Sequence, residues 1–460
     1  MNALLLSAIL GVVMMFTGIW VKKHATIKAV AISGAALLFI ANWLELKGTR
    51  LVNFDTAGFL SFNSFSLLFV AIAVFCTILF FLLNGNEMRK VGNNYADYYA
   101  LIFFITSGII LVASFTNLLI LFLGIEIITI PSYILAGADK RNLKSNEASL
   151  KYLLLGSFST GVMLLGIALI YGSQGTFEID KMQFAFEEGR KISNLQAAGM
   201  LLLLFSMAFK ASVAPFHFWA PDVYDGAPTV FASYMATIIK AAVFIGFIRL
   251  FESTFGALSQ TWQIWIAVLI AVTLLVGNIT ATFQQSVKRM LAYSSVSHAG
   301  FFLFAVYAMN EAAHEGLIIY AAGYCLATIG AFAMVAKMSD YSYEGFNGLA
   351  KHQPLLALTT TICLLSLAGI PLTVGFLGKF YMLKAAVLTG KHLWLVIFAV
   401  IMAAVGAYYY FRVIQAMYFK DGPDNSTGAT AVEKYTMVAI CVFIILLGVM
   451  PGLIITHLYF

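Results

Sequence analysis

The sequence predicts an all-α polytopic membrane protein with about fourteen transmembrane helices. Hydrophobic residues make up 61% of the 460 positions and charged residues only 10%, which leaves too little polar surface for a soluble globule of this length. The apolar residues gather into runs of about 17 to 25, the length that crosses the hydrocarbon core of a bilayer as a helix. These runs are too long and too uniformly apolar for barrel strands, so we expect a helical bundle.

The predicted helices follow one another along the whole chain, joined by short polar loops. Their centres lie near Gly11, Leu37, Val74, Ile105, Ile127, Gly161, Leu203, Ile239, Thr273, Phe302, Tyr324, Ile370, Gly406 and Phe443. The first run has no basic start and no small-residue cleavage site, so we expect a spanning helix there and not a signal peptide.

Basic residues in the loops predict the orientation of the bundle. If the N-terminus lies outside, fifteen lysines and arginines fall on the inner side and eight on the outer side. Cytoplasmic loops carry the excess of Lys and Arg. We therefore predict that both termini and the Ser173 to Asn194 loop face outward, and that Lys140 to Lys151 faces the cytoplasm.

Several classes of function are disfavoured by the composition. The formal net charge of +6 comes from basic residues scattered between apolar runs, a pattern that suits lipid headgroups better than nucleic acid. The four cysteines each stand singly inside apolar runs, which argues against an iron–sulfur or zinc site in this chain. The sequence has no Gly-rich dinucleotide turn and no Walker A motif, and its histidines do not pair for haem.

Three lysines lie deep in three different apolar runs. Lys210 follows the run from Leu195 to Phe209, Lys240 lies roughly 15 Å from either end of its run, and Lys379 lies in a longer, interrupted run. An ammonium group at such depth costs at least roughly 2.5 to 3.5 kcal/mol on insertion scales, so such groups usually line a hydrated ion or proton path. For Lys379, snorkelling of the side chain to the headgroups is the alternative.

Two further ionisable residues lie inside predicted helices. Glu126 is the acidic residue nearest the centre of a spanning run, and we expect it to be the partner of a buried lysine. The alternative is a neutral, hydrogen-bonded acid or a clamp between helices. His298 suits a proton relay, although a lone histidine in a membrane helix is often only hydrogen-bonded packing. His217 is expected to be structural.

Aromatic residues are expected to serve packing. The AYYYF segment from Ala407 to Phe411 is typical of a helix-packing and interface belt, and snorkelling would explain Arg412 beside it.

A weak internal repeat joins the two halves of the chain. FSMAFKASVAPFHFW from Phe205 and LSLAGIPLTVGFLGK from Leu365 align without a gap, and each contains a proline and a lysine. Paired, interrupted helices in two halves of a chain indicate a transport site at the repeat interface. The two segments enter the membrane from opposite sides in the predicted topology, as an inverted repeat requires.

The motifs resemble a known family. FKASVAPFHFWAPDVYDGAPTVFASYMATIIKAAVF from Phe209, QQSVKRMLAYSSVSHAGF from Gln284 and GIPLTVGFLGKF from Gly369, together with the Glu126 helix, look like the antiporter-like membrane subunits of respiratory complex I. The resemblance covers nearly the whole chain. It implies fourteen helices with two inverted five-helix repeats, broken seventh and twelfth helices, and one proton channel per subunit. Within a single membrane domain of residues 1–460, it implies three N-terminal helices in 1–96, repeats in 97–251 and 261–419, and a last helix in 435–457.

The resemblance also implies the functional residues and the setting. The proton pathway would comprise Glu126, Lys210, Lys240, His298 and Lys379, with no cofactor or metal in this chain. NADH, FMN, iron–sulfur clusters and quinone would be bound by partner subunits of a complex I in a bacterial inner membrane, with both termini periplasmic. The implied function is proton translocation within an NADH-quinone oxidoreductase. An Mrp-type cation/proton antiporter subunit and a purely structural membrane scaffold are the alternatives.

Overall fold

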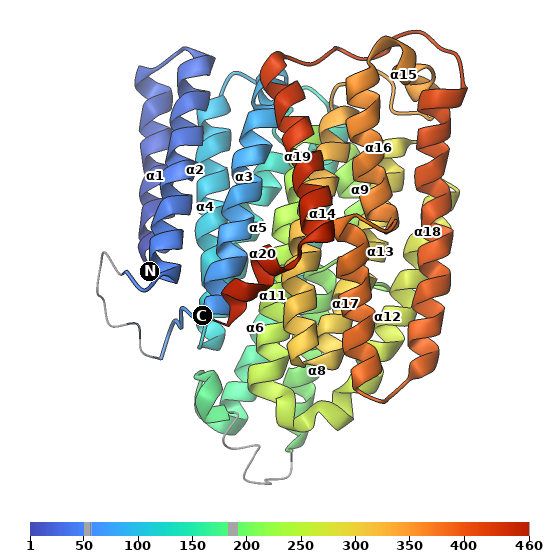
Figure 1. Ribbon diagram of the computed structural model, residues 1–460. Helices are drawn as coiled ribbons and strands as arrows, with labels where there is room; N and C mark the ends of the chain where they lie inside the picture. The colour runs from blue at the N-terminus through green and yellow to red at the C-terminus, as the bar shows by residue number, and fades with distance from the viewer. Residues whose placement is uncertain (50–55, 57, 183–191, 460) are drawn as a thin grey trace.

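The computed structural model describes residues 1–49, 56, 58–182 and 192–459, and it is almost entirely helical. Long helices stand side by side in one bundle, with connections at its two ends (Figure 1). Part of the loop from Ser173 to Asn194, for which we predicted an outward position, lies outside the described residues.

The helices of the first half follow one another from Asn2 to Phe255. They are α1 Asn2–Trp20, α2 His24–Leu46, α3 Ser64–Val91, α4 Tyr95–Ser114, α5 Leu118–Ala136, α6 Leu143–Gln174, α8 Asn194–Lys210, α9 Trp219–Gly226, α10 Thr229–Tyr234, η1 Met235–Ile239 and α11 Lys240–Phe255.

The second half continues the same pattern. Its elements are η2 Gly256–Leu258, α12 Ser259–Thr282, α13 Val287–Ala308, α14 Glu311–Val335, η3 Glu344–Phe346, α15 Leu349–His352, α16 Pro354–Ala368, α17 Val374–Leu388, α18 Leu393–Phe419, α19 Ala431–Val449, α20 Gly452–Ile455 and η4 Thr456–Leu458.

Eleven helical stretches of the described residues are long and apolar enough to cross a membrane. One of them, Thr229–Thr282, contains α10, α11 and α12 in succession, and α8 and α16 are shorter apolar helices. All the predicted run centres fall within helices except Ile370, which lies in the break between α16 and α17. The prediction of an all-helical polytopic membrane protein is confirmed.

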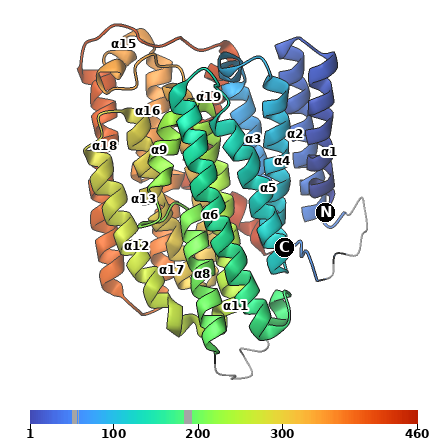
Figure 2. The same cartoon turned by 180° about the vertical axis from the view of Figure 1, so that it is seen from behind.

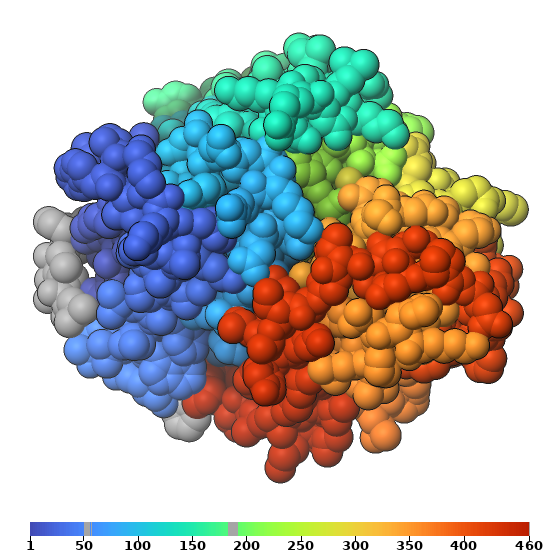
Figure 3. Space-filling model, turned by 90° about the horizontal axis from the view of Figure 1, so that it is seen from above, coloured from blue at the N-terminus to red at the C-terminus, as the bar shows by residue number. Residues whose placement is uncertain are grey.

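The two ends of the bundle are different. One end carries α15 and the connection between α18 and α19, and we call it the α15 face. The other lies nearer the two chain termini, and we call it the terminus face (Figure 1). Seen from above the α15 face, the α18–α19 connection lies across the molecule (Figure 3). It is held there by backbone hydrogen bonds from Ser339 N to Asn425 O and from Thr427 N to Lys337 O.

Two helices form the centre of the bundle. All of the most apolar 18-residue stretch of α14 is buried, and 94% of that of α13, against 22% for α1 and 33% for α18. The outer helices instead expose large apolar side chains, among them Phe158 of α6 and Trp265 of α12. Figure 2 shows α6, α8 and α12 from the back of the bundle. An apolar exterior of this kind suits lipid or other membrane subunits.

Both predicted interruptions are real breaks, and they are built in the same way. After α8, Ser212 has a positive φ of 55°, and Val213 N donates to Ala208 O while Ser212 N donates to Phe209 O. After α16, Gly369 has a φ of 86°, and Ile370 N donates to Leu365 O while Gly369 N donates to Ser366 O. This pair of bonds is the Schellman cap of a helix C-terminus.

The caps establish the correspondence between the two segments. By its hydrogen bonds, Ser212 corresponds to Gly369, whereas the gap-free sequence alignment pairs it with Leu372. The structural correspondence is therefore shifted by three residues from the sequence alignment. α8 and α17 lie in the half near the terminus face, and α9 and α16 in the half near the α15 face (Figures 1 and 2). The two broken helices therefore run in opposite directions through the bundle.

Candidate functional site

Glu126 and Lys210 are brought together by a threonine that the sequence did not indicate. The Lys210 ammonium donates to the Thr160 hydroxyl oxygen at 3.0 Å, and that hydroxyl donates to the Glu126 carboxylate at 2.8 Å. The ammonium also donates to Gly156 O at 3.4 Å. The predicted pairing of Glu126 with a buried lysine therefore exists, through a hydroxyl bridge between α5, α6 and α8.

Lys210 and Glu126 differ in how deeply they are buried. Lys210 is the last residue of α8 and is buried, whereas Glu126 is only half-buried on the outer side of α5. Lys210 stands at the C-terminus of α8, where a cation is favoured, and its ammonium reaches across to acceptors on α6. Trp219, from beyond the break, donates its indole N–H to Phe209 O at 2.9 Å and so satisfies one of the last carbonyls of α8.

Lys240 lies at the centre of the bundle and has a neutral environment. Its ammonium donates to the carbonyl oxygen of Ser295 at 2.9 Å and to the hydroxyl oxygen of the same residue at 2.8 Å, and it lies 5.8 Å from the centre of the Tyr224 ring. No carboxylate among the described residues forms an ion pair with it. A cation held by dipoles alone can lose its proton without leaving a buried anion behind.

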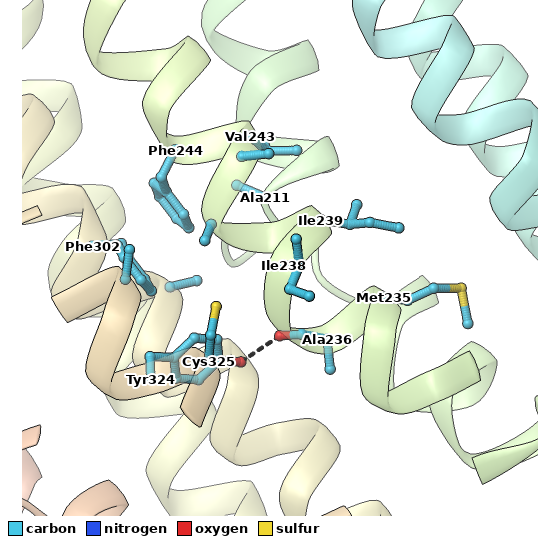
Figure 4. Packing of buried hydrophobic residues seen from close by; sticks show 14 of the residues in the cluster. Ala211, Met235, Ala236, Ile238, Ile239, Val243, Phe244, Phe302, Tyr324 and Cys325 are labelled. Atoms are coloured by element: carbon cyan, nitrogen blue, oxygen red, sulfur yellow. Dashed lines mark hydrogen bonds between the residues drawn. The ribbon is translucent and has the colours of Figure 1, made fainter. Parts of the chain in front are cut away.

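The backbone before Lys240 departs from the α-helix. Residues Met235–Ile239 form the π-helix η1, between α10 and α11. The wider turn leaves backbone carbonyls available, and the Tyr324 hydroxyl of α14 donates to Ala236 O at 2.6 Å, as the dashed line in Figure 4 shows. Single π-helical turns inside α-helices occur frequently at functional sites. The apolar pattern of the run gave no sign of this turn.

His298 lies between two tyrosines. Its Nδ1 is 2.6 Å from the Tyr320 hydroxyl of α14, and its Nε2 is 3.1 Å from the Tyr410 hydroxyl of α18. Neutral imidazole donates with one nitrogen and accepts with the other, so a proton that arrives at one nitrogen can leave from the other. These contacts are the ones that a relay needs, and they also fit the alternative of a hydrogen-bonded, structural histidine.

Lys379 points inward to the broken helix. Its ammonium donates to Leu367 O at 2.8 Å and to Ala368 O at 3.0 Å, the last carbonyls of α16, and it lies 5.1 Å from the centre of the Phe301 ring. The end of a helix carries a partial negative charge that stabilises a cation. The side chain does not extend toward the headgroups, so the snorkelling alternative for Lys379 is wrong.

His217 also belongs to this region. It is buried in the break between α8 and α9, it lies within the electrostatic range of Lys240, and its Nδ1 has no hydrogen-bond partner among the described protein atoms. The sequence suggested a structural group near the interface. It is buried, and its ring centre lies 4.5 Å from that of Phe218 and 6.5 Å from that of Tyr293 of α13.

Four partners of the predicted residues were missed by the sequence reasoning: Thr160, Ser295, Tyr320 and Tyr410. The AYYYF segment was predicted to be a packing and interface belt, and Tyr408 and Phe411, 57% and 46% exposed, fit the interface part. Tyr409 and Tyr410 face the interior. A usable signal was present in α13, where Ser294 and Ser295 precede His298 by one helical turn and therefore lie near it.

Two lysines counted as loop residues are also buried. Lys337 forms ion pairs with Glu433 at 2.8 Å and Glu87 at 3.5 Å, and this cluster joins the ends of α3, α14 and α19. Lys288 donates to the carbonyls of Asp225 and Ala227 at 2.7 and 2.8 Å, at the C-terminal end of α9. Neither lysine lay near the centre of an apolar run, which is why the sequence gave no sign of their burial.

The assembled groups are suited to proton transfer. They are ammonium, carboxylate, imidazole and hydroxyl groups, each of which can accept or donate a proton or a hydrogen bond. Among the described residues, no three His, Cys, Asp or Glu side chains are grouped so as to hold a metal ion.

A family model and individual relatives both match this chain to one membrane-protein family. Residues 115–406 match the family model described as NADH:quinone oxidoreductase/Mrp antiporter, TM. A protein of Cytophaga hutchinsonii named NADH-quinone oxidoreductase subunit N is 38% identical, over 99% of this chain and 98% of that protein.

Solved structures show the same fold. A chain of respiratory complex I from Thermus thermophilus with bound aureothin is 30% identical, with a TM-score of 0.84, and the match covers 99% of this chain and 98% of that one. A chain of the Mrp complex of a Dietzia species has a TM-score of 0.86 at 18% identity, covering 99% and 95%. The second likeness is one of fold alone.

Proposed function

This chain belongs to the NADH:quinone oxidoreductase/Mrp antiporter membrane family, and from that membership we propose how it moves protons. Within the family its curated relatives carry the name subunit N of NADH-quinone oxidoreductase, at 36 to 38% identity over nearly the full length. It is a proton-translocating membrane subunit of that enzyme complex, and this subunit family carries no redox cofactor itself. In the proposed division of labour, NADH, FMN, iron–sulfur clusters and quinone are bound by partner subunits.

The fold supports a more detailed membrane arrangement. With α8–α9 and α16–α17 each counted as one broken helix, and α10–α11 and α12 counted separately, the chain crosses the membrane fourteen times. The proposed inverted repeats are residues 97–251 and 261–419. Their opposed broken helices, closed by the same Schellman cap, support this assignment. We place the α15 face in the cytoplasm and both termini in the periplasm of a bacterial inner membrane, because the basic loops cluster on the α15 side.

The proposed path begins on the cytoplasmic side. Glu126 and Lys210 exchange a proton through Thr160. A cavity of about 390 Å³ opens at the α15 face beside Thr229 and Lys288, at the start of the helix that leads to Lys240. Protons that reach Lys240 pass by Ser295 and His298 toward Lys379 and then outward.

The observation that carries the proposal is the environment of the three lysines. Lys240 and Lys379 are held by carbonyl and hydroxyl oxygens, and Lys210 reaches its carboxylate only through a hydroxyl. A lysine clamped directly to a carboxylate would stay charged, whereas one held by neutral dipoles can be discharged and recharged in each cycle. A purely structural scaffold has no use for unpaired buried cations, which raise the cost of insertion.

The test is substitution of the central lysine in the assembled complex. We expect Lys240→Ala to leave assembly and NADH oxidation measurable while lowering proton uptake per electron in inverted membrane vesicles. Lys181→Ala is the matched control, because Lys181 is an exposed lysine paired with Glu178 near the terminus face. Normal proton uptake in the Lys240→Ala complex would contradict the proposed path and favour the scaffold reading.

A further inference from the structure

A second line of buried polar side chains leaves His298 in the direction of the α15 face. The Tyr410 hydroxyl, 3.1 Å from His298 Nε2, also hydrogen-bonds the Ser294 hydroxyl. On the same helix, the Tyr409 hydroxyl donates to the Asn278 amide oxygen at 3.1 Å and interacts with Ser294. All five side chains are at most 3% exposed. They lie between α12, α13 and α18, on the other side of α13 from the Lys240 contact.

A glycine makes room for this line. A Cβ added at Gly406 of α18 would lie 2.9 Å from the Asn278 amide oxygen and 3.4 Å from the Tyr409 hydroxyl. Glycine lowers the stability of a helix interior, by roughly 1 kcal/mol relative to alanine. At Gly406 the missing side chain leaves space next to the Asn278 amide oxygen and the Tyr409 hydroxyl. Space beside two polar atoms favours a hydrated route for protons over apolar packing of the helices.

The line continues to the α15 face through Tyr343. This tyrosine is 4% exposed, and its hydroxyl has no hydrogen-bond partner among the described protein atoms. Its ring packs on Arg412, which follows Tyr409 by three residues and so lies near it on α18. Burial raises the pKa of Tyr343 to about 12, so the hydroxyl stays neutral and can both donate and accept. Buried hydroxyls ordinarily have a partner, and water is the partner that fits a polar site of this kind.

Arg412 closes the line at the aqueous surface. Its guanidinium lies 3.9 Å from the centre of the Tyr343 ring and donates to Thr282 O at 3.1 Å. The side chain is half-buried, and its residue lies about 10 Å from the α15 end of α18 at 1.5 Å per residue. The carbonyl it binds belongs to the last residue of α12, so the snorkelling predicted for Arg412 is compatible with its position at this end of the bundle.

The hydroxyl groups are costly if their role is only packing. Phenylalanine would fill the same volume at Tyr343, Tyr409 and Tyr410, and burying a hydroxyl without full compensation is unfavourable. The three tyrosine hydroxyls lie along one helix interface that leads to His298. Their cost therefore indicates a role that uses the O–H bonds.

We propose that Tyr343, Tyr409, Asn278, Ser294 and Tyr410 form a second access branch, by which protons from the α15 face reach His298 without passing Lys210 or Lys240. This inference rests on the proposed function and names a further entrance to the same path. Water joins Tyr343 to Tyr409. Asn278 positions the Tyr409 hydroxyl and carries no proton itself, because its amide donates to Leu274 O. For transfer, the Tyr409 O–H turns from Asn278 to Ser294, Ser294 donates to Tyr410, and Tyr410 donates to His298 Nε2. A proton taken up at the surface then releases a different proton onto His298, and only O–H and N–H bonds change.

The first test removes the hydroxyl that makes no bond within the protein. Tyr343→Phe leaves the ring stacked against Arg412, so a structural role predicts no change. The branch predicts a lower initial rate of proton uptake per NADH oxidised in inverted vesicles. Tyr408→Phe is the matched control, because Tyr408 is an exposed tyrosine next to Tyr409 on the same helix. Equal proton uptake in the two variants would overturn the branch.

The second test asks whether the branch runs in parallel with the lysine route. We expect Lys210→Ala to retain part of the proton uptake, and Tyr343→Phe combined with Lys210→Ala to lose that remainder. Parallel routes give a double-variant loss greater than either single loss, whereas steps of one route give no further loss. Complete loss in Lys210→Ala alone would also overturn the branch. Gly406→Ala, which fills the passage without removing a polar atom, is expected to match Tyr343→Phe.

The failure of this inference is distinguishable from failure of the proposed function. If Lys240→Ala lowers proton uptake while Tyr343→Phe equals Tyr408→Phe, the lysine path stands and the branch does not exist. If Lys240→Ala has normal uptake, the proposed path itself is wrong.

Discussion

At the scale of single residues, the interior lysines are stabilised in three different ways. Lys210 shares Thr160 with a carboxylate, Lys240 is held by both oxygens of Ser295, and Lys379 is held by the free carbonyls at the end of α16. Each arrangement lowers the cost of burying an ammonium group, and none is a close ion pair. The three groups can therefore differ in how readily they give up a proton, which a path with a direction requires.

The Thr160 hydroxyl is the first residue to test at this scale. We expect Thr160→Val, which keeps the shape and removes the hydroxyl, to break the link between Lys210 and Glu126 and to lower proton uptake per electron in inverted vesicles. Thr129→Val is the control, because the Thr129 hydroxyl reaches Glu126 at 3.4 Å but does not contact Lys210. Equal losses in both variants would show that Glu126 alone, and not the bridge, is what matters.

The charged residues of the site could be predicted from the sequence, but the residues that hydrogen-bond them could not. Glu126, Lys210, Lys240 and Lys379 stand out because a charge in an apolar run is costly. Thr160 and Ser295 could not be selected, because serines and threonines recur throughout these helices and most hydrogen-bond their own backbone. Which hydroxyl meets a lysine depends on how the helices pack.

At the scale of helices, a break in the middle of the bundle leaves backbone carbonyls without helical hydrogen-bond partners, and a buried cation can bind them. The carbonyls that α16 leaves unpaired are the ones that Lys379 binds, and Gly369 is the left-handed residue that makes the end possible. The same element on α8 uses Ser212, a residue that adopts a positive φ at some energetic cost. The capping residue and the lysine thus form one unit in the broken helix α16–α17.

We expect Gly369→Ala to impair proton uptake more than its effect on stability explains. The new Cβ would meet the Lys379 side chain at 3.0 Å and displace the ammonium from its carbonyls. Gly390→Ala is the matched control, because Gly390 also has a positive φ, of 68°, with nothing within 4 Å of the added carbon. Both variants carry a backbone strain of roughly 1–2 kcal/mol. Measuring thermal stability and proton uptake together separates the two effects, and equal uptake would refute a coupled cap and lysine.

Two features of the helices were beyond sequence reasoning. The π-helix η1 has the same apolar residues as the α-helix around it, so its hydrogen-bond pattern leaves no trace in the hydrophobic period. The inward orientation of Tyr409 and Tyr410 was also missed, because three consecutive tyrosines necessarily point in different directions around a helix. Only the neighbouring helices decide which of them is buried.

At the scale of the whole molecule, the helical membrane fold was predictable and its orientation is a separate question. Long apolar runs leave the backbone no alternative to helices in lipid, so thirteen of the fourteen predicted centres lie in helices of the described structure. The remaining centre, Ile370, fell on the break because composition does not distinguish two half-helices from one helix.

The orientation can be tested with exposed positions at the two faces. We expect Gln260→Cys, at the terminus face, to react with a membrane-impermeant thiol reagent from the periplasm, and Asn146→Cys, near the α15 face, to react only from the cytoplasm. The four native cysteines are buried, so they give little background. Ser145, next to Asn146, is buried and would be a poor probe. Periplasmic labelling of Asn146→Cys alone would reverse the assignment.

The absence of ion-paired partners for Lys240 and Lys379 among the described residues has a consequence for the electrical balance of the interior. If Glu126 and all three lysines were ionised together, the core would hold an excess of two positive charges. Unit charges repel one another strongly in a medium of low dielectric constant. Along the proposed path, protonation of one lysine therefore favours deprotonation of the next, so that a proton entering at one end of the row of lysines would drive another out at the far end.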